Sequence, residues 1–285
     1  MAAAPGTVGV VGGGRMGAGI AQSFATAGSA VVVVESGEEA AAAALERVAT
    51  GLRRAAERGR LEEPAERVLA RVTTVTAVED LPAGADLVVE AVPEDPALKA
   101  RLLAAAEKAV GESTVLATNT SSLSVTELGA ALARPERFLG MHFFNPVPAS
   151  ALVELVVAGR TADGTVRAAL EWVRALGKKD VVVRDSPGFA SSRLGVALGL
   201  EAIRMVEEGV AEPEAIDAAM SLGYKHPMGP LRLTDLVGLD VRLAIAEYLH
   251  GTLGERFAPP KLLREKVARG ELGRKTGRGF YTWED

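Results

Sequence analysis

The sequence predicts an α/β protein in which an N-terminal domain built on a parallel sheet precedes an all-helical C-terminal domain. Short apolar runs alternate with amphipathic stretches up to about residue 185, whereas residues 190–270 are almost entirely helical in pattern. Near-continuous apolar strands that alternate with helices indicate a parallel sheet buried on both faces. We place the boundary at the segment DSPGF, which gives domains of residues 1–186 and 187–285.

The expected elements follow one another along the chain. The strand-like runs are TVGVV (7–11), AVVVVE (30–35), RVTTV (71–75), ADLVVEAV (85–92), TVLAT (114–118), FLGMHFF (138–144) and ALVELVV (151–157). Helical patterns in this half cover residues 16–27, 38–70 and 96–110, and Gly28 can close the first of these helices. The helical patterns of the second half are SRLGVALGLEAIRMVEEG, EPEAIDAAMSLG, RLTDLVGLDVRLAIAEYLHGTLG and PPKLLREKVARG.

The composition excludes several classes of protein. A net charge of −5 provides no basic field for nucleic acid or an anionic membrane. The chain has no cysteine, which excludes disulfides and thiolate chemistry, and its three histidines leave little room for a metal centre. No apolar run reaches the ~18 residues of a membrane span, and the N-terminus lacks a basic leader. We therefore expect a cytoplasmic enzyme without a metal.

Three glycines form a G-x-G-x-x-G pattern, GGGRMG, at the end of the first strand. The pattern opens a helix inside a βαβ unit, which is the context of a Rossmann-type dinucleotide site. Gly12 allows a tight turn, Gly14 lets a pyrophosphate approach the backbone, and Gly17 lets helix and strand pack closely. Arg15 and Met16 fill the variable positions and begin the helix, whose first N–H groups favour phosphates. The alternative is a turn of purely structural use.

Glu35 ends the second strand, where it can accept hydrogen bonds from the adenine ribose hydroxyls. A carboxylate there repels a 2′-phosphate, and no arginine follows in Ser36 and Gly37. The sequence therefore predicts NAD rather than NADP. The same glycine pattern serves flavins and several dehydrogenase families, so it predicts the cofactor better than the reaction.

His142 and Glu154 flank a proline-containing segment in MHFFNPVPASALVE. Oxidation of an alcohol with NAD requires a base, and histidine exchanges protons near neutral pH. A carboxylate on the other ring nitrogen would fix its tautomer and stabilise its charged form. Residues 145–148 (NPVP) cannot form regular helix, so we expect a stiff loop that leaves both side chains at strand ends on the carboxyl edge of the sheet. The alternative is an ordinary hydrogen-bonded core histidine.

Several motifs agree in order and spacing with one known family. The segments NTSSL, HFFNPVP with LVEL, HPMGPLRLTDLVGLD and GRKTGRGFY resemble those of the short-chain L-3-hydroxyacyl-CoA dehydrogenases, which include 3-hydroxybutyryl-CoA dehydrogenases. The resemblance extends from Val8 to Trp283. It implies an NAD domain, a helical domain that forms a homodimer, and an active site in the cleft between them. It also implies an enzyme of fatty acid metabolism, in beta-oxidation, that acts on acyl-CoA thioesters.

The resemblance further implies roles for individual residues. His142 matches the catalytic base, Glu154 its orienting carboxylate, and Ser121 a contact to substrate and cofactor. The positions matching the cofactor side are Glu94, Lys99, Asn145 and Lys275. From the residues alone, the preferred interpretation of Lys99 is a solvated charge at a helix start, and Thr120 and Ser122 fit a ligand-binding turn as well as Ser121 does.

The chain departs from the family pattern at two places. In DSPGFASSRLG, Ser192 stands where the family usually has an asparagine that contacts substrate near the reacting carbon; a serine hydroxyl can still donate. A serine and a lysine that touch CoA in the family correspond to Gly51 and Arg58. Arg58 lies in a basic segment that would suit the CoA 3′-phosphate or an acyl carrier protein, although interspersed glutamates are equally typical of a solvated helix face.

The predicted reaction is the reversible, NAD-dependent oxidation of an (S)-3-hydroxyacyl-CoA, such as 3-hydroxybutyryl-CoA, to the 3-oxoacyl-CoA. Three alternatives stay open. The substrate could be an acyl carrier protein thioester or a sugar acid, or the chain could bind NAD without catalysis. A third possibility is the β-hydroxyacid dehydrogenase group, whose catalytic lysine lies in the second domain. Lys178 and Lys179 precede the predicted boundary and are poorly placed for that role.

Overall fold

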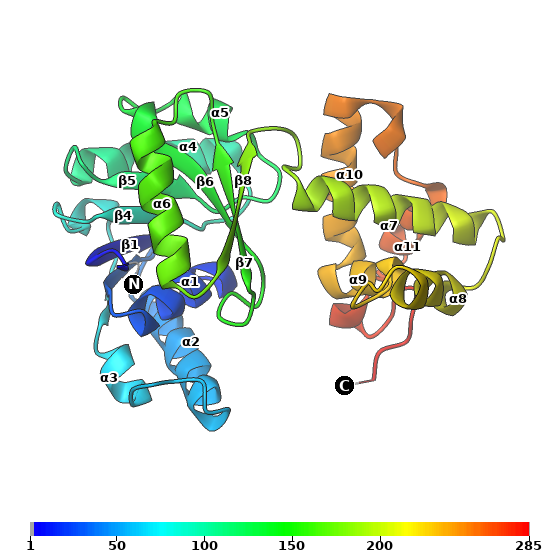
Figure 1. Ribbon diagram of the computed structural model, residues 1–285, viewed down its shortest axis with the longest axis horizontal. Helices are drawn as coiled ribbons and strands as arrows, with labels where there is room; N and C mark the ends of the chain where they lie inside the picture. The colour runs from blue at the N-terminus through cyan, green and yellow to red at the C-terminus, as the bar shows by residue number, and fades with distance from the viewer. Residues whose placement is uncertain (1–2, 285) are drawn as a thin grey trace. The chain divides into compact units, whose positions relative to one another are not determined.

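The computed structural model describes residues 3–284, and the chain divides into two compact units, Met1–Asp185 and Ser186–Asp285 (Figure 1). The first unit is an eight-stranded sheet with helices on both faces, and the second is built from helices. The predicted fold class, a Rossmann-type domain followed by an all-helical one, is confirmed.

The strand order of the sheet is β3-β2-β1-β4-β5-β6-β7-β8. The strands are β1 (Thr7–Val11), β2 (Ala30–Val34), β3 (Val72–Val75), β4 (Leu87–Glu90), β5 (Val115–Thr118), β6 (Phe138–Phe143), β7 (Leu152–Val157) and β8 (Lys179–Arg184). Chain progression reverses direction between β1 and β4, and in sheets of this kind ligands bind at such a switch point, outside the carboxyl ends of the strands.

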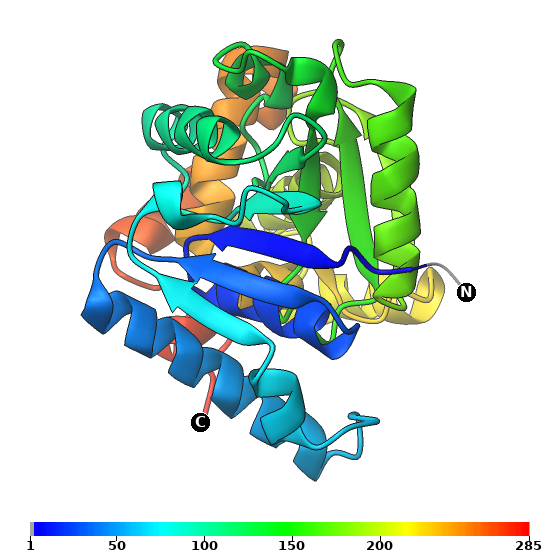
Figure 2. The same cartoon turned by 90° about the vertical axis from the view of Figure 1, so that its left-hand side faces the viewer.

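Helices cover the sheet because its strands carry apolar residues on both faces. The helices of this unit are α1 (Arg15–Thr26), α2 (Glu38–Glu57), α3 (Ala65–Leu69), α4 (Pro96–Ala109), α5 (Val125–Gly129) and α6 (Asp163–Ala175). Helices α1 and α2 lie on one side of strands β1, β2 and β3, and α4 lies on the other side of the sheet (Figure 2). All residues of β4, β5 and β6 are buried, as expected for doubly covered strands.

The sheet differs from the expected parallel one at its last two strands. Strands β6 and β7 pair antiparallel, and β8 pairs parallel to β7. The reason is the short connection 144–151, since a parallel pairing needs a crossover of roughly a dozen residues or more. Strand β8, which was not among the expected strands, forms an edge and is largely exposed.

The second unit is helical, as its sequence pattern predicts. Its helices are α7 (Ser191–Glu207), α8 (Pro213–Ala218), which continues into a π-helical turn, α9 (Pro230–Val237), α10 (Leu239–Leu253) and α11 (Lys261–Ala268). Helix α7 packs against α9 and α10 (Figure 1). Their buried side chains form a separate core around Leu200, Ile203, Leu231 and Leu249.

Asp235, on α9, fastens the C-terminal segment to this core. Its carboxylate is only 1% exposed and accepts hydrogen bonds from the backbone N–H groups of Phe280 and Tyr281. The Trp283 indole N–H donates to the same carboxylate at 2.9 Å. Three donors satisfy the buried charge, so the carboxylate stabilises the fold instead of straining it.

We predict that Asp235→Asn lowers the free energy of unfolding by about 2–4 kcal/mol, because an amide nitrogen would face donors where an oxygen now accepts. Urea unfolding followed by Trp283 fluorescence measures the change. Glu214→Gln, at an exposed position on α8, is the matched control and should be neutral. Equal stability of the two variants would contradict the prediction.

Candidate active site

The glycine loop between β1 and α1 has the shape that a dinucleotide needs. Gly12 has a φ of +96°, and a Cβ atom at Gly17 would lie 1.7 Å from the Gly12 carbonyl oxygen. A Cβ atom at Gly14 would meet nothing within 4 Å, so the backbone there faces open space. No side chain caps the start of α1, where Arg15 and Met16 begin the helix. The first N–H groups of α1 can therefore bind the pyrophosphate of NAD.

Glu35 lies against this loop. Its Oε1 accepts a hydrogen bond from the Gly13 backbone N–H at 2.6 Å, and its Oε2 accepts one from Ser36 at 3.2 Å. The carboxylate is thus fixed against the glycine loop. Arg47, which the sequence motif does not reveal, reaches from α2 and donates to the Gly13 carbonyl oxygen at 3.2 Å. A cation is therefore present near the loop, although none follows Glu35 directly in sequence.

His142 and Glu154 are directly opposite each other in the β6–β7 pairing. His142 Nδ1 lies 3.0 Å from Glu154 Oε2, a distance at which an Nδ1–H group donates to the carboxylate. Glu154 is 1% exposed and His142 is 7% exposed. The Phe144 ring packs against the imidazole, with ring centroids 4.3 Å apart. Burial and a fixed partner give the imidazole one orientation.

The loop 144–151 between the two strands is supported by Lys178. The Lys178 ammonium is buried and donates to the carbonyl oxygens of Val147 and Ser150, at 2.7 Å and 2.6 Å. Burial lowers the pKa of Lys178 below the usual value for lysine. Since its donors hold this loop, Lys178 acts as a support in the first unit. Asn145, in the same loop, is exposed.

A buried cluster of charges joins the ends of β4 and β5. Lys99 has no exposed surface, and its ammonium lies 2.7 Å from Glu90 Oε1. The same ammonium donates to the carbonyl oxygens of Val92 and Asn119. Thr118 donates to the second oxygen of Glu90 at 2.6 Å. The interpretation of Lys99 as a solvated charge is therefore wrong, because Lys99 lies on the face of α4 that packs against β4 and β5.

Glu94 connects this cluster to the NTSSL turn. It lies 3.4 Å from the Lys99 ammonium and accepts hydrogen bonds from the hydroxyls of Thr120 and Ser122. The Ser121 backbone N–H also donates to Glu94, at 3.2 Å. Within residues 3–284, the half-buried Ser121 hydroxyl itself makes no hydrogen bond. Of the three neighbouring hydroxyls, only that of Ser121 is left to meet a ligand.

Asn119 extends the same network to the end of β6. Its side-chain oxygen accepts a hydrogen bond from the Phe143 backbone N–H at 3.0 Å, next to His142. Its own backbone N–H donates to the Glu90 carbonyl oxygen at 2.7 Å. Sequence reasoning missed both Glu90 and Asn119. The available signal was an acid inside the apolar strand LVVE, since a buried carboxylate requires a partner.

The remaining predicted residues lie on other elements of the two units. Ser192 is half-buried in the first turn of α7, and Lys275 is held by the Asp240 carboxylate at 2.6 Å. Both belong to the second unit. Arg58 ends α2 in the first unit and is exposed. Gly51 is packed against the Gln22 side chain, which a Cβ atom would meet at 2.1 Å.

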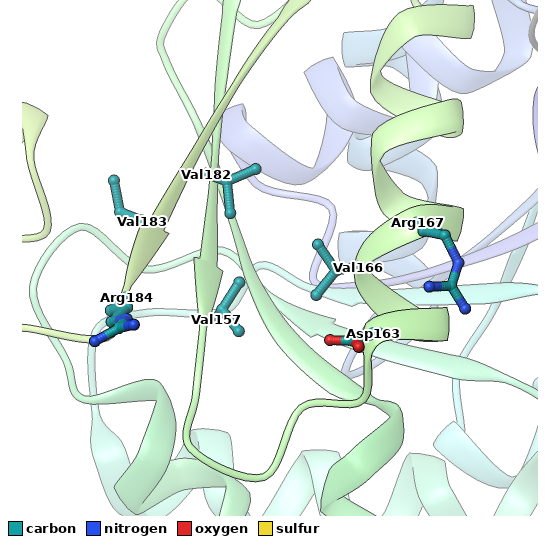
Figure 3. A pocket seen from close by; sticks show the side chains of 7 residues that line it. All are labelled: Val157, Asp163, Val166, Arg167, Val182, Val183 and Arg184. Carbon is teal, nitrogen blue, oxygen red and sulfur yellow. The ribbon is translucent and has the colours of Figure 1, made fainter.

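An open pocket lies elsewhere in the first unit, between α6 and strands β7 and β8 (Figure 3). It is lined by Val157, Asp163, Val166, Arg167, Val182, Val183 and Arg184. None of the predicted site residues lines it. No cluster of three or more histidine, aspartate or glutamate side chains suited to a metal ion occurs among residues 3–284.

We predict that Lys99→Met lowers the free energy of unfolding by about 3–5 kcal/mol, because it leaves the Glu90 carboxylate buried without its cation. The double variant Lys99→Met/Glu90→Gln should recover part of this loss. Lys108→Met, at an exposed position on the same helix, is the matched control. Chemical denaturation measures all three, and a Lys99→Met protein as stable as the control would refute the role of the cluster.

Comparison with known proteins places the chain in a family. The model of the 3-hydroxyacyl-CoA dehydrogenase NAD binding domain matches residues 7–186, and that of the family's C-terminal domain matches residues 188–283. A Bacillus subtilis protein named probable 3-hydroxybutyryl-CoA dehydrogenase is 44% identical over 278 residues, covering 97% of this chain and 96% of the relative.

Solved structures agree with this assignment. Mycobacterium tuberculosis FadB2 superposes with a TM-score of 0.94 at 43% identity, covering 99% of this chain and 100% of that chain. The (S)-3-hydroxybutyryl-CoA dehydrogenase PaaH1 from Ralstonia eutropha gives 0.93 at 43% identity, with the same coverage. The chain therefore belongs to the 3-hydroxyacyl-CoA dehydrogenase family and is an NAD-dependent oxidoreductase with a Rossmann-like NAD-binding domain and a helical C-terminal domain.

Proposed function

We propose that this chain interconverts (S)-3-hydroxyacyl-CoA and 3-oxoacyl-CoA thioesters, with 3-hydroxybutyryl-CoA as a substrate and His142 as the general base. The observation that carries the proposal is the buried His142–Glu154 pair at the carboxyl end of β6. The glycine loop opens at the carboxyl end of β1 in the same sheet. A base and a dinucleotide site at one sheet edge suit hydride transfer from an alcohol.

In the oxidation direction, His142 takes the proton from the substrate hydroxyl. Since Nδ1 faces Glu154, the proton moves to Nε2. Glu154 stabilises the imidazolium that forms and keeps the ring in one orientation. NAD supplies the acceptor for the hydride that leaves the carbinol carbon. In the reverse direction His142 returns the proton to the carbonyl oxygen, so the same pair supports both directions.

Ser121 and Ser192 are proposed to position the substrate. The Ser121 hydroxyl is the one in its turn that Glu94 does not engage, which supports a contact to the substrate oxygen or the nicotinamide. Ser192 takes the place of the family's asparagine and offers one hydroxyl from the start of α7. Lys99 and Glu94 are proposed to act on the cofactor side by holding the Ser121 turn. Asn145 and Lys275 are likewise proposed to contact the cofactor.

Coenzyme A is the proposed carrier of the acyl group. The Bacillus subtilis and Ralstonia eutropha relatives bear the name of a CoA-dependent enzyme, which supports this choice. Arg54, Arg58 and Arg60 are exposed and form no ion pair within residues 3–284, so they are able to meet the CoA 3′-phosphate. The proposed setting is fatty acid beta-oxidation in the cytoplasm. Among the described residues, no helix has the length and apolar character to cross a membrane.

We predict that His142→Gln lowers kcat by roughly 100-fold or more, the scale for loss of a general base, while NADH affinity stays nearly unchanged. Steady-state kinetics with acetoacetyl-CoA and a fluorescence titration with NADH measure the two quantities. His250→Gln is the matched control, because His250 also pairs with a glutamate at 3.0 Å but lies at the surface of the second unit. Near-normal turnover by His142→Gln would overturn the assignment.

The carrier and cofactor are tested on the unmodified protein. We expect acetoacetyl-CoA to be reduced with a far higher kcat/KM than acyl carrier protein thioesters, and NADH to be preferred over NADPH because Glu35 repels a 2′-phosphate. Sugar acids should not be oxidised. Turnover of the carrier protein thioester or a sugar acid in preference to the CoA substrate would replace this proposal with one of its alternatives.

We also propose that the second unit forms a homodimer and carries the substrate-binding face. Eight exposed large apolar side chains lie on this unit: Leu194, Val210, Leu222, Tyr224, Leu233, Leu236, Val237 and Val241. Leu222 and Tyr224 are each 75% exposed. Such a concentration of exposed apolar surface is typical of a subunit interface.

We predict that the double variant Leu222→Asp/Leu236→Asp sediments as a monomer at micromolar concentration, whereas the unmodified protein sediments as a dimer. Buried aspartates would lose solvation that the interface cannot replace. Val182→Asp, on the exposed edge strand of the first unit, is the control and should stay dimeric. Analytical ultracentrifugation distinguishes the states, and an unmodified protein that is monomeric would contradict the homodimer.

A further inference from the structure

Arg242, on α10 of the second unit, is a buried cation without a counterion. It is only 7% exposed, and no carboxylate within residues 3–284 forms an ion pair with it. Its Nε is fully enclosed and has no hydrogen-bond partner. The two terminal nitrogens also make no hydrogen bond, and they retain the little exposure that the side chain has. Burial lowers the pKa of Arg242 to about 10.

The guanidinium points at a face of α7 that has no side chains. A Cβ atom at Gly195 would lie 3.2 Å from Arg242 Nη1 and 3.8 Å from Nη2. One turn further along α7, a Cβ atom at Gly199 would lie 3.1 Å from Thr234 Oγ1. Thr234 Oγ1 and Arg242 Nε are the two enclosed side-chain polar atoms without a partner in the described part of the chain. Both unsatisfied groups therefore border the same glycine-lined face.

The glycine-lined face of α7 continues from Ser192, the residue that is proposed to contact the substrate. Ser192 and Gly195 are three residues apart on α7, so they lie on one side of the helix, about 4.5 Å apart along its axis. Ser192 is proposed to hold the substrate beside its reacting carbon. A guanidinium one turn further on would meet the acyl chain beyond that carbon.

An unpaired buried guanidinium is costly, and the interaction that offsets this cost is a bidentate contact with a carboxylate. We propose that Arg242 is a specificity-determining residue that binds a carboxylate at the far end of the acyl chain, so that the preferred substrates are 3-hydroxyacyl thioesters of dicarboxylic acids. The inference rests on the proposed function, since it assumes that Ser192 faces the substrate.

Two thioesters that differ in a single terminal group test the proposal. In 3-oxohexanoyl-CoA the acyl chain ends in a methyl group, and in 3-oxoadipyl-CoA a chain of equal length ends in a carboxylate. We expect the unmodified protein to favour 3-oxoadipyl-CoA in kcat/KM by roughly 10- to 100-fold, the scale of charged hydrogen bonds. Arg242→Met should abolish the preference, and Arg242→Lys should retain part of it. Acetoacetyl-CoA turnover should stay within a few-fold in all three proteins.

Two controls test whether the preference depends on Arg242 itself. Arg264→Met removes a surface arginine that is paired with Glu247 and should leave the preference intact. Arg242→Met should also unfold at a temperature no lower than the unmodified protein, because it removes an uncompensated buried charge. A marked fall in Tm would indicate that the guanidinium already has a structural partner and would overturn the proposal.

The outcomes also distinguish the proposed function from the inference. A protein that reduces acetoacetyl-CoA and 3-oxohexanoyl-CoA but does not favour 3-oxoadipyl-CoA refutes the role of Arg242 alone. A protein that reduces none of the three refutes the proposed function, and the inference falls with it. If Arg242→Met changes the sedimentation coefficient but not the substrate preference, the guanidinium serves the contact between subunits and the proposal is wrong.

Discussion

The antiparallel pairing of β6 with β7 is the constraint on which the candidate active site depends. In an antiparallel pair, opposite residues present their side chains on the same face and close together. This pairing sets His142 opposite Glu154, so the distance between base and carboxylate is fixed by backbone hydrogen bonds. Lys178 holds the intervening loop by two of its carbonyl groups. The proline-containing segment therefore serves to reverse the chain while keeping the two strands in register.

A second constraint ties this pair to the cofactor side. The buried Glu90–Lys99 pair lies between β4 and α4, and Asn119 carries its hydrogen bonds across β5 to Phe143, beside His142. Removing two charges from water is costly, and in this cluster several hydrogen bonds to each charged group offset that cost. The outcome is one connected polar layer along the carboxyl edge of the sheet, in which the turns after β4 and β5 are held at fixed positions.

The second unit contains buried polar groups of two kinds. Asp235 is satisfied by three donors and holds the C-terminal segment in place. Arg242 is also buried but has no hydrogen-bond or ion-pair partner in residues 3–284. Since folded proteins pair nearly all their buried polar groups, the first kind accounts for stability. A buried polar group without a partner, such as Arg242, is typical of a ligand-binding residue. The two residues therefore support different conclusions.

The sequence by itself determined the fold class and the glycine loop with Glu35, because periodicity and local motifs report on backbone conformation within a few residues. It predicted the His142–Glu154 pair but left an ordinary core histidine as the alternative. It did not determine the direction of β7 or the edge strand β8, and from the residues alone it favoured a solvated position for Lys99. Glu90, Asn119, Arg47 and Arg242 were not singled out at all. Their importance arises from partners distant in sequence: Lys99 meets Asn119, and Arg242 meets Gly195. Only tertiary structure decides which polar groups are desolvated together, and desolvation is what turns an ordinary charge into a support or a binding group.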